Sequence, residues 1–67
     1  MRYWYFEYFG YKYKVQTTYI NKTREVAELL YDEWLKQRGG SRGDFDERNI
    51  SAIYERMELS EKEETEW

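Results

Sequence analysis

The stretch YWYFEYFGYKYK, residues 3–14, limits most strongly what this chain can fold into, because eight of its twelve residues are aromatic. In the part that follows Gly10, apolar and polar side chains alternate as they do in a β-strand with two different faces. Gly10 can adopt the positive φ of a tight hairpin turn. The sequence therefore predicts a β-hairpin over the first twenty residues.

Two registers of this hairpin are open. With Phe9-Gly10 as the loop, Glu7 faces Lys12, and with Gly10-Tyr11 as the loop, Glu7 faces Lys14. Both registers place the same residues on the same faces. One face carries Trp4, Phe6, Tyr8, Tyr11, Tyr13 and Val15, and the other carries Tyr3, Tyr5, Glu7, Phe9, Lys12, Lys14 and Gln16. The first strand is apolar on both faces, which is typical of a central strand.

The segment NKTREVAELLYDEWLKQRGG predicts a helix over residues 22–38. Asn21 is a suitable N-cap, and cations in the last turn favour the helix dipole. Gly39 and Gly40 provide the stop. The apolar stripe of this helix is formed by Val26, Ala27, Leu30, Tyr31 and Trp34.

Residues 45–59 have two interpretations. Asp44 and Glu47 have the spacing of a capping box, and Ile50, Ile53, Tyr54 and Met57 have helical spacing. However, NISAIY is rich in the β-branched and aromatic residues that favour strands, and Ile50, Ala52 and Tyr54 alternate as in a strand. A third strand would make the marginal two-stranded sheet viable. We therefore predict an α+β fold of ββαβ order, in which one helix packs on one face of a three-stranded antiparallel sheet with the strand order 2-1-3. The alternative is ββαα.

Composition excludes several classes of function. The chain has 67 residues with neither Cys nor His, so disulfides, ordinary zinc sites and the commonest catalytic bases and nucleophiles are missing. We expect no enzyme activity, no metal and no cofactor. No apolar run reaches the length of a signal peptide or of a membrane span. We therefore expect a cytoplasmic protein without a membrane partner.

Charge divides the chain into two parts. The net charge is −3, and residues 41–67 hold nine Asp and Glu against four Lys and Arg. We predict a single domain over residues 1–59 and an acidic, mobile tail over residues 60–67. A second hypothesis gives the acidic end a role as a phosphate mimic that occupies a basic groove on a partner. Its residues are Glu58, Glu61, Glu63, Glu64 and Glu66.

The whole layout resembles one kind of protein. A hairpin opening of the type MRYWYFEYFGYKYKV, an amphipathic helix, a closing ISAIYERMEL and a Glu-rich end look like many small uncharacterised proteins of phages and other mobile elements. The resemblance implies an intracellular, non-enzymatic accessory protein, such as an inhibitor of a host system. It assigns no functional residues.

One sheet face is the candidate binding surface. If the helix covers the face of Trp4 and Phe6, the open face presents Tyr3, Tyr5, Phe9, Lys12 and Lys14. Exposed aromatic patches mark interaction sites, and we predict that this one contacts a protein partner or a second copy of the chain. The alternative is single-stranded nucleic acid, with bases stacked on the aromatic rings and phosphates at the lysines. A third interpretation is that the tail or the DFDER loop covers the face as core.

Overall fold

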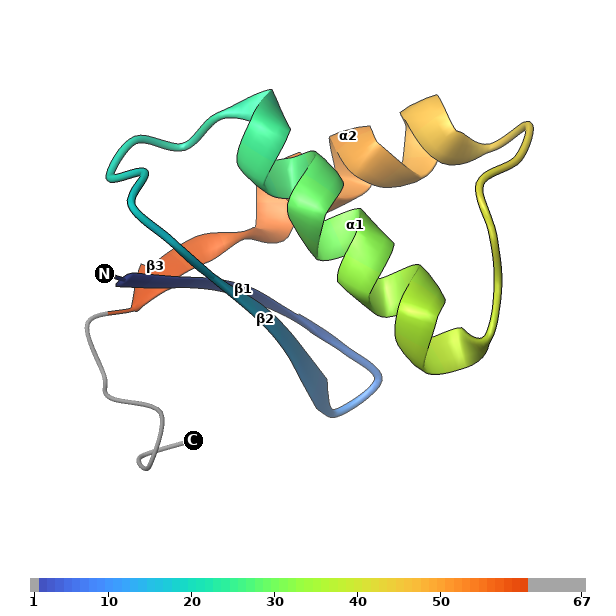
Figure 1. Ribbon diagram of the computed structural model, residues 1–67, viewed down its shortest axis with the longest axis horizontal. Coiled ribbons are helices and arrows are strands. Elements are labelled where there is room, and N and C mark those ends of the chain that lie inside the picture. Colours follow the sequence, from blue (N-terminus) through green and yellow to red (C-terminus); the bar gives the residue numbers. More distant parts are fainter. Residues whose placement is uncertain (1, 61–67) are drawn as a thin grey trace.

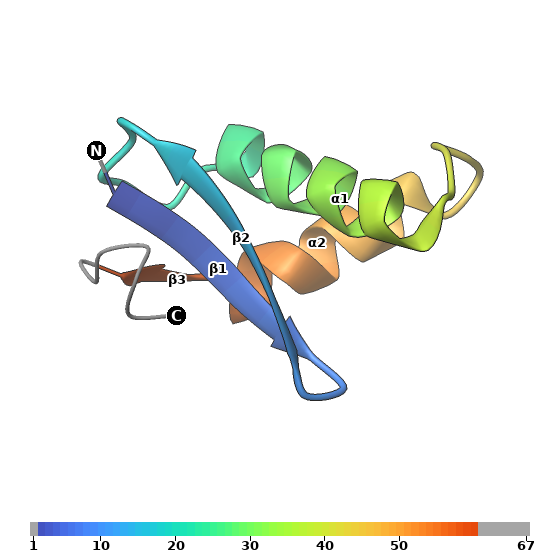
Figure 2. The ribbon, with the colours of Figure 1, turned by 60° about the horizontal axis from the view of Figure 1, so that its bottom comes forward.

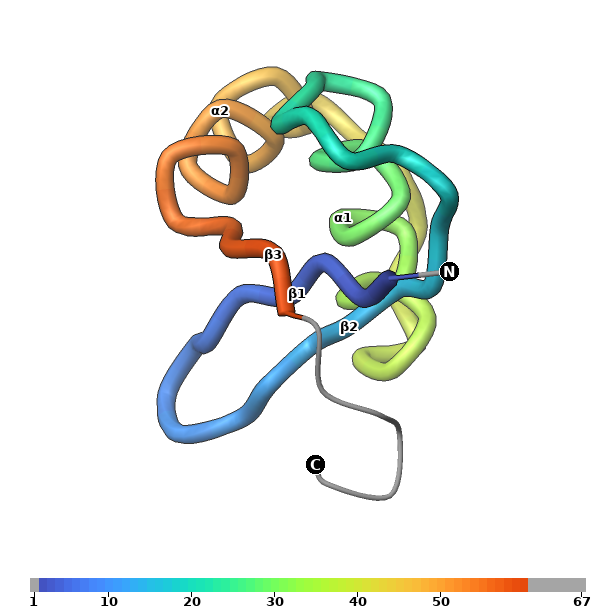
Figure 3. Tube along the Cα trace, turned by 90° about the vertical axis from the view of Figure 1, so that its left-hand side faces the viewer, coloured from blue at the N-terminus to red at the C-terminus, as the bar shows by residue number. Residues whose placement is uncertain are grey.

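The computed structural model of the chain describes residues 2–60. Its elements, in chain order, are β1 (Arg2–Tyr8), β2 (Tyr11–Thr17), α1 (Arg24–Arg38), α2 (Asp46–Arg56) and β3 (Glu58–Ser60). The three strands form one antiparallel sheet in the order β2-β1-β3. Both helices lie on the same side of this sheet (Figures 1 and 3). The predicted α+β class, the strand order and the central position of β1 are confirmed.

The hairpin uses the first of the two predicted registers. Its loop is Phe9-Gly10, Tyr8 pairs with Tyr11, and Glu7 pairs with Lys12. The two loop residues have φ angles of 50° and 80°. Positive φ at both central positions matches the twist of the flanking strands, which explains why a two-residue loop closes this hairpin.

Helix α1 begins two residues later than predicted. Thr23 is the N-cap, with an extended backbone and a hydroxyl that accepts from the N–H of Val26, so the prediction of Asn21 was wrong. In the connection between β2 and α1, the Tyr19 carbonyl accepts a hydrogen bond from the Trp4 indole N–H at 3.0 Å, which holds this connection against the sheet. The helix ends as expected, at Gly39 in the left-handed conformation.

The prediction of one helix was wrong, because most of residues 45–59 form the second helix α2. Ile50, Ile53 and Met57 are all buried, whereas Ala52 and Tyr54, which alternate with Ile50 in the strand interpretation, are exposed. Helical spacing therefore buries more apolar surface here than strand spacing does. The third strand follows α2 and pairs Glu58–Ser60 with Tyr3–Tyr5.

The core lies between the sheet and the two helices. Its sheet layer is Trp4, Phe6 and Tyr13, and the Phe6 and Tyr13 rings stack with their centroids 5.2 Å apart. The helices contribute Val26, Ala27, Leu30, Tyr31, Ile50 and Ile53, and Met57 closes the cluster where α2 passes into β3. The predicted core face of the hairpin is thus confirmed for its middle residues.

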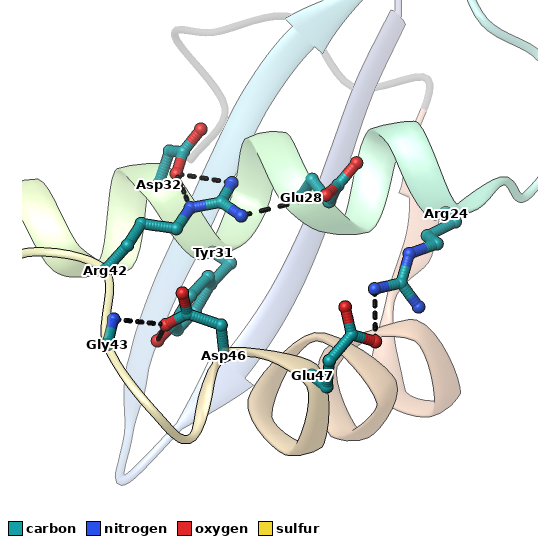
Figure 4. A network of polar contacts seen from close by, with 8 residues as sticks. All are labelled: Arg24, Glu28, Tyr31, Asp32, Arg42, Gly43, Asp46 and Glu47. Carbon is teal, nitrogen blue, oxygen red and sulfur yellow. Dashed lines mark hydrogen bonds and ion pairs between the residues drawn. The ribbon is translucent and has the colours of Figure 1, made fainter.

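A polar network joins α1 to the start of α2 (Figure 4). The hydroxyl of the buried Tyr31 donates to Asp46 at 2.6 Å, and the Gly43 N–H donates to the same carboxylate oxygen at 2.8 Å. Arg42 contacts Asp32 through two nitrogens, at 3.0 and 2.8 Å. Asp46 itself, rather than the capping box predicted from Asp44 and Glu47, anchors this turn. Within residues 2–60, no side chain forms a capping hydrogen bond at the N-terminus of α2.

The boundary of the predicted tail also changes. Ser60, expected as its first residue, is the last residue of β3 and is buried. Glu58 is likewise part of β3. The other four glutamates of the acidic end, Glu61, Glu63, Glu64 and Glu66, lie outside the described residues.

Candidate functional site

The sheet face opposite the helices brings together four of the five predicted partner-binding residues. The Nζ atom of Lys12 lies 5.7 Å from the centroid of the Tyr5 ring, and that of Lys14 lies 5.5 Å from the centroid of Tyr3. These pairs are diagonal neighbours on adjacent strands, within reach of a long side chain. Each lysine cation is therefore placed against the electron-rich face of a tyrosine.

Tyr5 also holds the edge of this face to β3. Its hydroxyl donates to Glu58 Oε2 at 2.8 Å. This hydrogen bond, then partial desolvation and the negative charges of Glu58 and Glu7, raises the pKa of Tyr5 above its ordinary value. The acidic residue predicted to act from a tail is therefore a structural partner of the sheet.

Phe9, the fifth predicted residue, lies apart from the other four. It occupies the hairpin loop, the residue is 89% exposed, and its ring meets the Tyr8 ring edge-on with centroids 4.5 Å apart. Tyr11, on the other side of the loop, is 67% exposed although the sequence pattern assigned it to the core face. We call Tyr8, Phe9 and Tyr11 the hairpin end. Its position at the turn, beyond the reach of the helix stripe, is the signal that could have identified Tyr11.

A small pocket lies beside the hairpin end and was not predicted. Its volume is about 160 Å³, and its lining residues are Phe6, Tyr8, Trp34, Asn49, Ala52, Ile53 and Arg56. We call it the hairpin pocket. One wall is well supported, because the Trp34 ring stacks on Tyr31 at 5.7 Å and carries the Arg38 guanidinium 4.4 Å from its centroid. The hairpin pocket is formed by β1, α1 and α2 together, so no single segment of sequence reveals it.

The charge of the open sheet face bears on the alternative ligand. Lys12 and Lys14 are balanced there by Glu7 and Glu58, and both lysines already lie over tyrosine rings. A nucleic-acid base would have to displace these cations in order to stack. Single-strand binding grooves carry an excess of positive charge along the backbone path, which this face lacks.

Two further findings limit the chemistry of the site. Within residues 2–60, no group of three or more Asp or Glu side chains is placed to hold a metal ion. In the same part of the chain, neither helix is long and apolar enough to cross a membrane.

Comparisons of the chain with protein-family models, with curated proteins and with solved structures found no match.

Proposed function

We propose that this chain is a small, non-enzymatic protein-binding module that contacts its partner through the hairpin end. The conformation of Phe9 carries the proposal. Its φ of 50° is unfavourable for a bulky L-residue, and the residue is 89% exposed to water. The tight turn requires a positive φ at this position, but Asn or Gly adopts it more readily than Phe, so the fold does not need a phenylalanine here. A strained residue of this kind is typical of functional sites.

The surroundings of Phe9 support a protein partner. Tyr11 is also largely exposed, and the apolar hairpin pocket lies next to Tyr8. Aromatic side chains grouped around a pocket are typical of the centres of protein interfaces, where a few anchors supply most of the binding free energy. A site made of a protruding ring and an adjacent pocket can serve a different protein or a second copy of the chain.

The remaining parts of the proposal come from composition and layout. The chain contains no His or Cys, which supports a binding role over catalysis. An intracellular accessory protein that inhibits a larger partner is the form of the function that the layout implies. The phosphate-mimic hypothesis requires Glu61, Glu63, Glu64 and Glu66, which lie outside the described residues.

The test compares three versions of the full chain: wild type, Phe9→Asn and Phe45→Asn. Phe45 is a matched control, because it is an exposed aromatic residue, at 69%, in the loop before α2. Self-association is measured by sedimentation velocity, and partner capture is measured by photo-crosslinking to lysate proteins of the source cells. We expect wild type and the Phe45 variant to behave alike and the Phe9 variant to lose its contacts.

Two results would contradict the proposal. If all three versions bind equally well, the hairpin end is not the contact. If none of them self-associates or captures a protein, while labelled single-stranded DNA or RNA binds and weakens steeply with salt, the function belongs to the nucleic-acid class instead.

A further inference from the structure

The central strand is only partly covered on one side. β3 pairs with Tyr3–Tyr5, but β1 continues to Tyr8. Residues 6–8 are flanked by β2 on one side, and within residues 2–60 no strand flanks them on the other. Figure 2 shows the hairpin extending well past β3. An uncovered strand edge of this kind is a template for pairing with another chain.

The backbone of Glu7 faces this edge. In a two-residue hairpin, the pair that closes the loop exchanges hydrogen bonds, and hydrogen-bonded pairs then alternate along the ladder. The closing pair is Tyr8 and Tyr11, so Tyr8 and Phe6 direct their N–H and C=O groups to β2. Glu7, like Tyr3 and Tyr5, directs its groups to the opposite side. Glu7 therefore continues the row of backbone groups that β3 begins to use.

Side-chain sites flank the edge on both faces of the sheet. On the helix side lies the hairpin pocket, of about 160 Å³. A cavity of roughly this size is enough for a benzene ring. On the open side lies a shallow depression, and Arg56 borders both hollows. The depression is lined by three glutamates against two cations, namely Glu7, Glu55 and Glu58 against Lys12 and Arg56, with Tyr5.

Resting on the proposed function, we propose that this edge of β1 accepts an extended segment of the partner protein as a fourth strand. Residues opposite Phe6 and Tyr8 would direct their side chains to the hairpin pocket, and the residue opposite Glu7 would point to the acidic depression. The side chains of the matching partner segment are therefore apolar, basic and apolar, in that order. Main-chain hydrogen bonds supply affinity in this mode of recognition, and the alternating side chains supply specificity.

A second copy of the chain does not fit this edge. A symmetric antiparallel pairing of two Phe6-Glu7-Tyr8 segments places Glu7 directly opposite the partner copy's own glutamate. Like charges in directly opposed positions destabilise a strand pair. The edge is therefore suited to a different protein, whichever contacts Phe9 makes.

The test uses a labelled peptide, Thr-Ser-Phe-Lys-Phe-Ser-Thr, titrated into the isotope-labelled full chain. Two matched peptides serve as controls. One has Glu in place of Lys, and the other has a lysine methylated at its main-chain nitrogen, which keeps the side chain and removes the main-chain N–H. We expect backbone shifts centred on Glu7 and slower exchange of its amide hydrogen. The N-methyl peptide should bind roughly tenfold more weakly, because one main-chain hydrogen bond to an exposed edge is lost. The Glu peptide should bind roughly fivefold more weakly.

Variants of the chain locate the contact. Ala52→Trp fills the hairpin pocket from α2 and should abolish binding. Ser51→Trp, at the neighbouring exposed position outside the pocket, is its control and should leave binding unchanged. Glu7→Lys should reverse the preference, so that the Glu peptide binds more tightly than the Lys peptide. This reversal keeps the test decisive if the larger side chain at position 52 prevents folding.

The outcomes separate the two proposals. If none of the peptides binds, or if the shifts centre on Tyr3 and Lys14, the edge proposal is overturned while Phe9-dependent protein capture can still stand. If the N-methyl peptide binds as tightly as its parent, the added-strand geometry is wrong. Loss of Phe9-dependent capture together with peptide binding at Glu7 would overturn the role of the hairpin end and keep the edge.

Discussion

Removal of one hydroxyl group, in Tyr31→Phe, tests whether the polar network between the helices stabilises the fold. The Tyr31 side chain is buried, and its hydroxyl donates to Asp46 at 2.6 Å and accepts from Asn49 Nδ2 at 3.4 Å. The substitution keeps the ring, so its packing against Trp34 is retained. Only the hydrogen bonds change.

The expected loss follows from the kind of hydrogen bond. A hydrogen bond to an ionised group contributes about 1.5–3 kcal/mol to the free energy of unfolding. Asp46 is half-exposed and keeps its hydrogen bond from Gly43. We therefore expect a loss at the lower end of this range, about 1.5 kcal/mol. In a domain of this size, that loss lowers the melting temperature by roughly 6–12 °C. Urea and thermal unfolding followed by circular dichroism measure both values.

The pH dependence provides a second measurement. The bonds from Gly43 and Tyr31 lower the pKa of Asp46 below its ordinary value of 3.8. Because the folded-state pKa is the lower one, Asp46 contributes stability above pH 3.8 that is lost as the pH falls through the lowered pKa. Tyr31→Phe removes one of the two main causes, so its stability should fall less steeply with acid than that of wild type.

The double variant Tyr31→Phe/Asp46→Asn supplies the control. If the hydroxyl acts through this carboxylate, Tyr31→Phe should lower the free energy of unfolding clearly less in the Asp46→Asn background than in wild type. A Tyr31→Phe protein with unchanged urea midpoint and unchanged acid unfolding would refute the reasoning. So would strict additivity of the two substitutions.

Three further predictions concern a cap, a turn and the alkaline limit. Thr23→Ala should destabilise the fold by about 1 kcal/mol in urea unfolding, whereas Asn21→Ala should have no measurable effect; equal losses would place the cap elsewhere. Phe9→Asn should not lower the urea midpoint, because Asn accepts a positive φ more readily than Phe does; a clear loss would show that the ring stabilises the hairpin. Hydrogen bonds to Glu58 and Asp46 raise the pKa values of Tyr5 and Tyr31, so they contribute stability below about pH 10 that is lost as the pH rises through the raised pKa values. Phenolate absorbance should therefore show these two tyrosines titrating late in wild type, and Tyr5 should titrate at a lower pH in Glu58→Gln than in wild type while Tyr31 is unchanged.

Local patterns were sufficient for the elements that bury a single face. The alternation around Gly10 predicted the hairpin and its core face, and the stripe of α1 with its glycine stop predicted the first helix. The strand order followed from β1, whose two apolar faces indicated a central strand. The hairpin and helix patterns depend on neighbours two to four residues apart, which are visible in the sequence.

The candidate site was predicted only in part, for a geometric reason. Tyr3, Tyr5, Lys12 and Lys14 were assigned to one face because strand alternation is strict. The exposure of Tyr11 and the presence of the hairpin pocket depend on where α1 and α2 end above the sheet. The turn position of Tyr11 is a local signal of its exposure, but no local pattern reveals the hairpin pocket.

Residues 45–60 mark the division between sequence and tertiary structure most clearly. Their sequence contained both a helical stripe and a strand signal, and by itself it left the choice open. The tertiary structure accommodates both, because α2 buries Ile50 and Ile53 in the core while the short β3 pairs only with Tyr3–Tyr5 of β1. The sequence thus determined a hairpin, a helix and an aromatic core. Long-range packing decided the second helix and the length of β3, and with it the edge at Glu7 that no strand within residues 2–60 covers. The second helix depends on contacts with α1, and β3 depends on pairing with β1, more than fifty residues away in the chain.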